Sequence, residues 1–94
     1  MLTVQDCLEL ANLTLDEVES IVQHEHLPFC VAITKGADFL EQPHGPCAIR
    51  QMIADNRDHA REAGHIEESV RLTAVYRRAC VHHPGGVDRR TRNR

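Results

Sequence analysis

The chain has 94 residues, of which 41 % are apolar and 27 % are charged, and its formal net charge is −3. This length leaves room for one domain with one modest core, and this composition excludes wholesale disorder. No apolar run reaches the roughly 18 residues that a membrane-spanning helix needs. A carboxylate at Asp6 interrupts the start before any signal peptide could form, so we expect a cytoplasmic protein with no membrane attachment.

The charges are unevenly distributed along the chain. Residues 1–45 carry a net charge of −7, residues 46–86 carry +1, and residues 87–94 carry +3. An acidic first half disfavours nucleic-acid binding, because phosphate contacts require Lys and Arg. The sequence predicts a single helical domain over residues 1–86 and a mobile basic tail over residues 87–94.

Capping residues mark the first helices. Thr3 precedes an amphipathic segment at residues 4–11. Thr14, with Glu17 three residues later, forms the capping-box pattern at the start of a helix over residues 15–26. Pro28 ends that helix and begins a third, over residues 29–41.

The second half of the chain predicts two longer helices. Pro46 begins a helix over residues 47–63, and Gly64 is a natural C-terminal cap. A fifth helix follows over residues 66–83, and so tight a connection predicts an antiparallel hairpin. The predicted fold is therefore all-α, a small bundle of about five helices in which the last two form a long antiparallel hairpin.

The core must be assembled from small side chains. The chain contains no Trp, two Phe and one Tyr, and Gly36 inside the apolar arc of the third helix predicts a close helix crossing. The fifth helix is apolar over more than half of its circumference. We therefore expect a homo-oligomer, in which Leu72, Val75 and Ala79 form the strip left open by the monomer.

Three polar residues interrupt the predicted apolar stripes. Asn56 is either a hydrogen-bonded core amide or a polar group at an oligomer seam. Arg77 is expected to pair with a carboxylate or to extend outward past small neighbours. His59 has Asp55 and Glu62 on its own face, which suggests a proton switch or, less directly, metal ligands.

Seven histidines and four cysteines raise the question of a metal. The cysteines lack any CxxC pair and are expected to be reduced core residues. In the segment 24–26, His-Glu-His, the two histidines point nearly opposite ways on a helix. Cys80 and His83 share a face while His82 points away, so His26, Cys80 and His83 would offer zinc donors, but no sequence signal brings them together. We expect no metal, no cofactor and no metal-ligating residue.

No catalytic pattern is present either. The sequence lacks a Ser-His-Asp order, a GxSxG elbow, a Gly-rich phosphate loop and HExxH. Cys47 lies near a helix start, where a thiol can be activated, but an inert thiol is the expectation. The third helix carries Lys35 against Asp38 and Glu41, which argues against DNA recognition. We therefore assign no catalytic or cofactor-binding residue and expect a protein that is not an enzyme.

The chain resembles a group of short helical bacterial proteins without an assigned function. Three short motifs carry the resemblance: His24-Glu25-His26-Leu27-Pro28, Ile49-Arg50-Gln51-Met52-Ile53 followed by Asp55, and His83-Pro84. It extends over most of residues 2–84. The resemblance implies a compact helical fold and a bacterial cytoplasmic setting, but it supplies no activity, ligand or site.

Two functions follow from these observations. The preferred interpretation is a non-enzymatic protein-interaction or regulatory module that self-associates and has a protein partner. The alternative is a metal-binding or metal-sensing helical protein that uses some of its histidines and cysteines as ligands.

Overall fold

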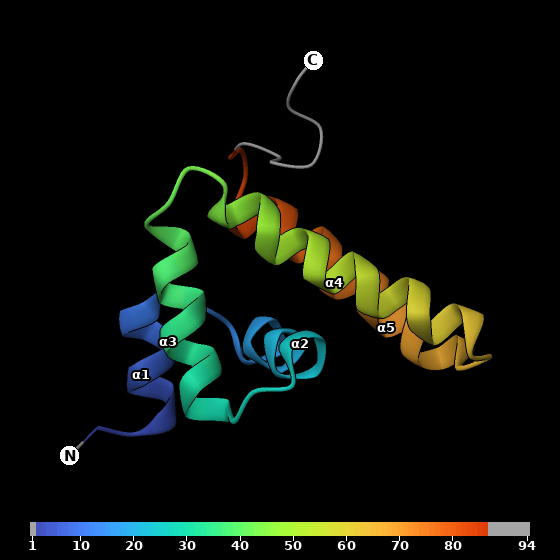
Figure 1. The fold of residues 1–94 in the computed structure, drawn as a ribbon, viewed down its shortest axis with the longest axis horizontal. Coiled ribbons are helices and arrows are strands. Elements are labelled where there is room, and N and C mark those ends of the chain that lie inside the picture. The colour runs from blue at the N-terminus through green and yellow to red at the C-terminus, as the bar shows by residue number, and fades with distance from the viewer. Residues whose placement is uncertain (1, 87–94) are drawn as a thin grey trace.

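The computed structural model describes residues 2–86, and these residues form five helices and no strand (Figure 1). This confirms the predicted all-α bundle, and each helix end lies within two residues of its predicted position. The expected basic tail, residues 87–94, lies outside the described residues. The helices are α1 (Val4–Ala11), α2 (Leu15–Glu25), α3 (Phe29–Leu40), α4 (Gly45–Glu62) and α5 (Ile66–His82).

Local caps explain where the first two helices begin and end. The Thr3 hydroxyl accepts a hydrogen bond from the Asp6 N–H, and the Asp6 carboxylate accepts one from the Thr3 N–H, both at 3.1 Å. Asn12 and His26 end α1 and α2 in the left-handed region, at φ 59° and 58°. These short, well-defined ends set the directions in which the chain leaves each helix.

The α4–α5 hairpin is the longest feature of the molecule. The two helices run antiparallel and side by side, joined at Gly64, whose φ is +84° (Figure 1). α2 and α3 pack against α4, while α1 packs against α3 at the edge of the bundle. The tip of the hairpin, residues 61–67, is exposed throughout. Within residues 2–86, no helix combines the length and apolar character that crossing a membrane requires.

One cluster of buried apolar side chains joins all five helices. Gly36 packs against this cluster, and a Cβ atom there would stand 2.8 Å from Leu13 Cδ1 and 3.0 Å from Ile21 Cδ1. The close crossing predicted from Gly36 is therefore confirmed. The cluster comprises Leu8, Leu13, Val18, Ile21, Ala32, Ile49, Met52, Ile53, Leu72, Val75 and Ala79.

The strip expected to remain open on α5 is instead part of the core. Leu72, Val75 and Ala79 are 0 %, 2 % and 0 % exposed, so the placement of a dimer interface on them is wrong. The physical reason is that the other helices cover this side of α5 within one chain. A second copy is therefore not needed to bury these three residues.

Candidate metal centre

A buried carboxylate lies at the start of α2. The predicted capping box is present: the Thr14 hydroxyl accepts from the Glu17 N–H at 3.2 Å, and Glu17 Oε1 accepts from the Thr14 N–H at 3.0 Å. Such a glutamate is commonly solvated at a helix start, but here Glu17 is only 2 % exposed because the end of α5 covers it. A buried carboxylate is costly unless it is paired and hydrogen-bonded, so its neighbours define the site.

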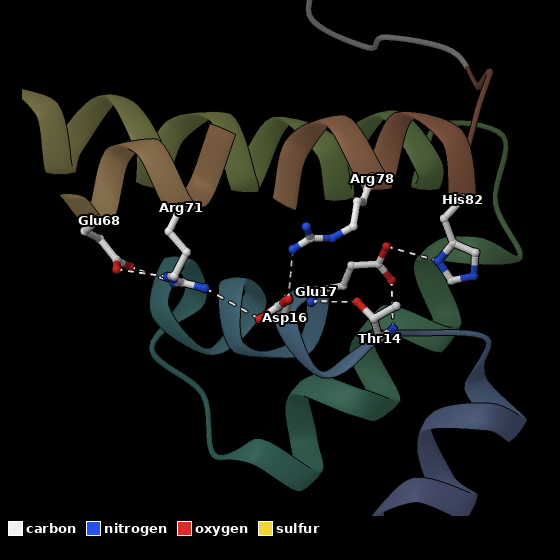
Figure 2. A network of polar contacts seen from close by, with 7 residues as sticks. All are labelled: Thr14, Asp16, Glu17, Glu68, Arg71, Arg78 and His82. Atoms are coloured by element: carbon white, nitrogen blue, oxygen red, sulfur yellow. Dashed lines mark hydrogen bonds and ion pairs between the residues drawn. The ribbon is translucent and has the colours of Figure 1, made fainter. Parts of the chain in front are cut away.

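The end of α5 supplies those neighbours. His82 is the last helical residue, and His83 leaves the helix at φ −130° and ψ 72°. This change of backbone direction brings the His83 imidazole to the side of the helix on which His82 lies, and both rings face Glu17. His83 Nε2 lies 3.0 Å from Glu17 Oε1, and His82 Nδ1 lies 3.1 Å from Glu17 Oε2. Figure 2 shows Glu17 between Thr14 and His82. The expectation that His82 points away from His83 is therefore wrong, since it assumed a continuous helix.

The site is arranged to hold positive charge against one carboxylate. His82 Nε2 lies 3.2 Å from Asn12 Oδ1, so both ring nitrogens of His82 face oxygen acceptors. Both can donate only when the ring carries two protons. The His82 and His83 rings lie 3.9 Å apart between centroids, tilted by 39°. A metal ion bound between these side chains would place positive charge beside the buried Glu17 carboxylate.

A clamp from α4 holds the chain beyond α5. The Arg50 guanidinium donates to the carbonyl oxygens of His83 and Gly85, the latter at 2.9 Å. Gly86 then passes so close to α4 that a Cβ atom there would lie 3.1 Å from Pro43 O and 3.2 Å from Cys47 N. Because its backbone is fixed in this way, the buried His83 ring is positioned before any ligand binds.

An ion-pair network lies beside the cluster and also links α2 to α5 (Figure 2). Asp16 accepts from Arg71 at 3.5 Å and from Arg78 at 3.3 Å. Arg71 also makes a two-point contact with Glu68, at 3.0 and 2.7 Å, and this hydrogen bonding holds the pKa of Glu68 below its usual value. The network keeps the start of α2 beneath α5, which fixes Glu17 relative to the two histidines.

The three side chains fit a small transition-metal ion. Two imidazole nitrogens and one carboxylate oxygen lie within 4.8 Å of one another. Zinc bonds to such donors measure about 2.0–2.2 Å, which separates tetrahedral ligand atoms by about 3.3 Å. The observed 3.0 and 3.1 Å contacts join the two rings to different oxygens of Glu17, so one ion held by all three side chains requires a shift of this carboxylate or of a ring. The His82 side chain is 33 % exposed, so water could reach the ion from that side.

The ligand set considered from the sequence is only partly brought together. His83 belongs to the cluster, whereas no grouping of His26, Cys80 and His83 forms within residues 2–86. His26 is exposed at the opposite end of α2 from Glu17. His24 instead bridges two carboxylates, with Nδ1 2.7 Å from Glu25 and Nε2 3.0 Å from Asp55. All four cysteines are free.

The three polar residues that interrupt the predicted apolar stripes differ in their burial. Asn56 is buried and donates to the Ser20 carbonyl at 2.9 Å, so it is a core amide that joins α4 to α2. His59 and Arg77 are exposed, so neither is a core residue, and Arg77 follows the expectation that it extends outward. Helical spacing alone does not locate the buried side of a helix, and both residues lie outside the buried part.

Glu17 is the functional candidate that the sequence analysis missed. The sequence predicted its capping-box role. Local patterns could not predict that Glu17 is buried or that it contacts His82 and His83, which lie 65 and 66 positions further along the chain. In comparisons with protein-family models, curated proteins and solved structures, no match to this chain was found.

Proposed function

We propose that this protein is a non-enzymatic regulatory module that binds one divalent transition-metal ion, with zinc as the best fit. Glu17, His82 and His83 are the proposed protein ligands. The convergence of two imidazoles on one buried carboxylate is the observation that carries the proposal. This is the metal-binding alternative of the sequence analysis with a different ligand set, in which cysteine has no part.

The donor chemistry favours zinc and its neighbours over calcium or magnesium. Imidazole nitrogens suit Zn²⁺, Co²⁺, Ni²⁺ and Cu²⁺, whereas Ca²⁺ and Mg²⁺ select oxygen ligands. Three protein ligands would leave one position of a tetrahedral ion for water, on the exposed side of His82. Arg50, through the backbone beyond His83, and Thr14, through its N–H bond to Glu17, would support the ligands from outside.

Metal binding at this position would stabilise one particular junction of the fold. The ligands join the start of α2 to the end of α5, two segments that few other contacts connect. An ion that binds only the folded junction stabilises it by about 2.7 kcal/mol at one hundred times its dissociation constant. Metal availability would thereby control the stability of the contact between the end of α5 and the start of α2. This control is the basis for a regulatory role.

Cobalt substitution tests the proposal on the full chain, purified without a histidine tag and treated with a chelator. We expect one Co²⁺ per chain, with visible absorption bands typical of nitrogen and oxygen ligands. His82→Asn should abolish the bands while leaving the far-ultraviolet circular dichroism unchanged, because His82 lies at the solvent-accessible side of the cluster. Glu17→Gln should also abolish them.

His65→Asn is the matched control, since His65 is exposed at the hairpin tip and its side chain makes no cap hydrogen bond. This variant should bind cobalt like the wild type. A thiolate-to-cobalt charge-transfer band would assign binding to the cysteines and contradict the proposal. Undiminished bands in His82→Asn would contradict it equally.

A further inference from the structure

The outer face of α5 is apolar and exposed. Ile66, Val70 and Val81 are 58 %, 64 % and 82 % exposed. Their spacing of four and eleven residues places them on one side of the helix. This side lies opposite the buried face formed by Leu72 and Val75. The outer face of α5 comprises Ile66, Val70, Thr73, Ala74, Arg77 and Val81.

We propose that the outer face of α5 binds the same face of a second copy of this chain, with the two helices antiparallel. This inference is independent of the proposed metal site. A two-fold axis between Thr73 and Ala74 pairs Ile66 of each chain with Val81 of the other. Symmetric pairing of one patch with itself is the commonest way in which soluble proteins dimerise.

The centre of this face allows the helices to approach closely. Ala74 is small, and the Thr73 hydroxyl already donates to the Ser69 carbonyl at 2.9 Å. Thr73 can therefore present its methyl group without leaving an unsatisfied donor. The same axis sets Val70 of each chain beside Arg77 of the other, whose aliphatic stem can cover it.

Charge complementarity selects a second copy in the antiparallel orientation. The first turn of α5 carries Glu67, and its last turns carry Arg77 and Arg78, all exposed. The proposed register places Glu67 of one chain within one helical turn of Arg77 of the other, at both ends of the interface. Within residues 2–86, no ion pair engages Arg77, so it has a charge available for this contact. A parallel pair would instead juxtapose like charges, and its helix dipoles would repel.

The expected dimer is weak. One 17-residue helix face per chain gives an interface at or below the roughly 1,200 Å² typical of transient complexes. Sedimentation of chelator-treated protein over a series of micromolar to millimolar concentrations measures this directly. We expect the mass to rise reversibly from 10.6 kDa toward twice that value.

Variants locate the interface. Val70→Arg and Glu67→Arg should each keep the chain at 10.6 kDa, because each sets a second cation close to Arg77 of the other chain. The double variant Glu67→Arg, Arg77→Glu should dimerise again, since the exchanged charges attract. Val31→Glu, at an exposed site on α3, is the control and should dimerise like the wild type. A wild-type monomer at every concentration, or a dimer that persists in both single variants, would overturn the proposal.

Discussion

Glu17 and His83 are 66 positions apart in the sequence, but Glu17 Oε1 and His83 Nε2 are 3.0 Å apart and both side chains are buried. Neither group could be buried alone without a large desolvation cost. The contact forms only when the start of α2 and the end of α5 are both correctly folded. Its integrity therefore reports on the long-range assembly of the bundle, whether or not an ion is bound.

Replacing this carboxylate should be costly. Glu17→Gln exchanges one acceptor oxygen for an NH₂ group, which cannot accept from both histidines and Thr14. We expect the free energy of unfolding to fall by about 1–3 kcal/mol, measured by urea denaturation without metal. Glu19→Gln, at an exposed position of the same helix, should stay within about 0.5 kcal/mol of the wild type. Equal losses in the two variants would contradict the buried contact.

The orientation of α5 can be tested with two neighbouring truncations. Leu72 is fully buried, so Leu72→Ala should lower the free energy of unfolding by about 2–5 kcal/mol. Val70 is exposed, and Val70→Ala should change the free energy of unfolding by less than about 0.5 kcal/mol at concentrations where the chain is monomeric. Urea denaturation of both variants decides the point. A larger effect at Val70 would mean that α5 is rotated.

Gly45 should not tolerate a side chain. A Cβ atom there would overlap the Phe39 carbonyl oxygen, a backbone atom that can move only with the end of α3. We expect Gly45→Ala to cost about 3 kcal/mol or more. Gly64→Ala is the control, because open space surrounds Gly64 and only its φ of +84° opposes the substitution, at about 1 kcal/mol. Thermal unfolding should rank Gly45→Ala well below Gly64→Ala.

Acid should weaken the Glu68–Arg71 pair. Hydrogen bonding to Arg71 lowers the pKa of Glu68, so its stabilisation is fully present above the ordinary carboxyl pKa of 4.5 and is lost as pH falls through the lower folded value. Glu68→Gln should therefore lower the free energy of unfolding by about 0.5 kcal/mol at pH 6, and by almost nothing at a pH below the folded pKa of Glu68. Glu67→Gln, in the same helical turn, controls for the helix dipole. A Glu68→Gln loss that does not shrink in acid would contradict this prediction.

The helices were predictable because their signals are local. Thr14 and Glu17 form their capping box within one turn. Pro28 precedes α3 because its φ is restricted, and Gly64 joins α4 to α5 because glycine readily takes a positive φ. Helix positions therefore followed from residues near each boundary. The antiparallel hairpin followed from the shortness of one connection.

The direction of each helix face was harder to predict. On α5, apolar residues cover both the buried side, at Leu72, and the exposed side, at Val70. Periodicity alone could not decide between them, because the choice depends on which side α4 and the N-terminal helices occupy.

The candidate site depended on a single residue at a helix end. If α5 continued through His83, adjacent histidines would point about 100° apart, as the sequence analysis assumed. Because the helix ends at His82, both rings reach Glu17. Sequence patterns locate helix ends only to within a few residues, and this site required greater accuracy than that.

X-ray absorption at the zinc edge, on the full chain loaded with one equivalent of Zn²⁺, tests the central claim most directly. The proposed ligands, Glu17, His82 and His83, predict a first shell of nitrogen and oxygen at about 2.0–2.2 Å with the outer-shell scattering of two imidazoles. A sulfur shell at about 2.3 Å would instead place the ion on the cysteines. That result, or a protein that retains no zinc after gel filtration, would contradict the account.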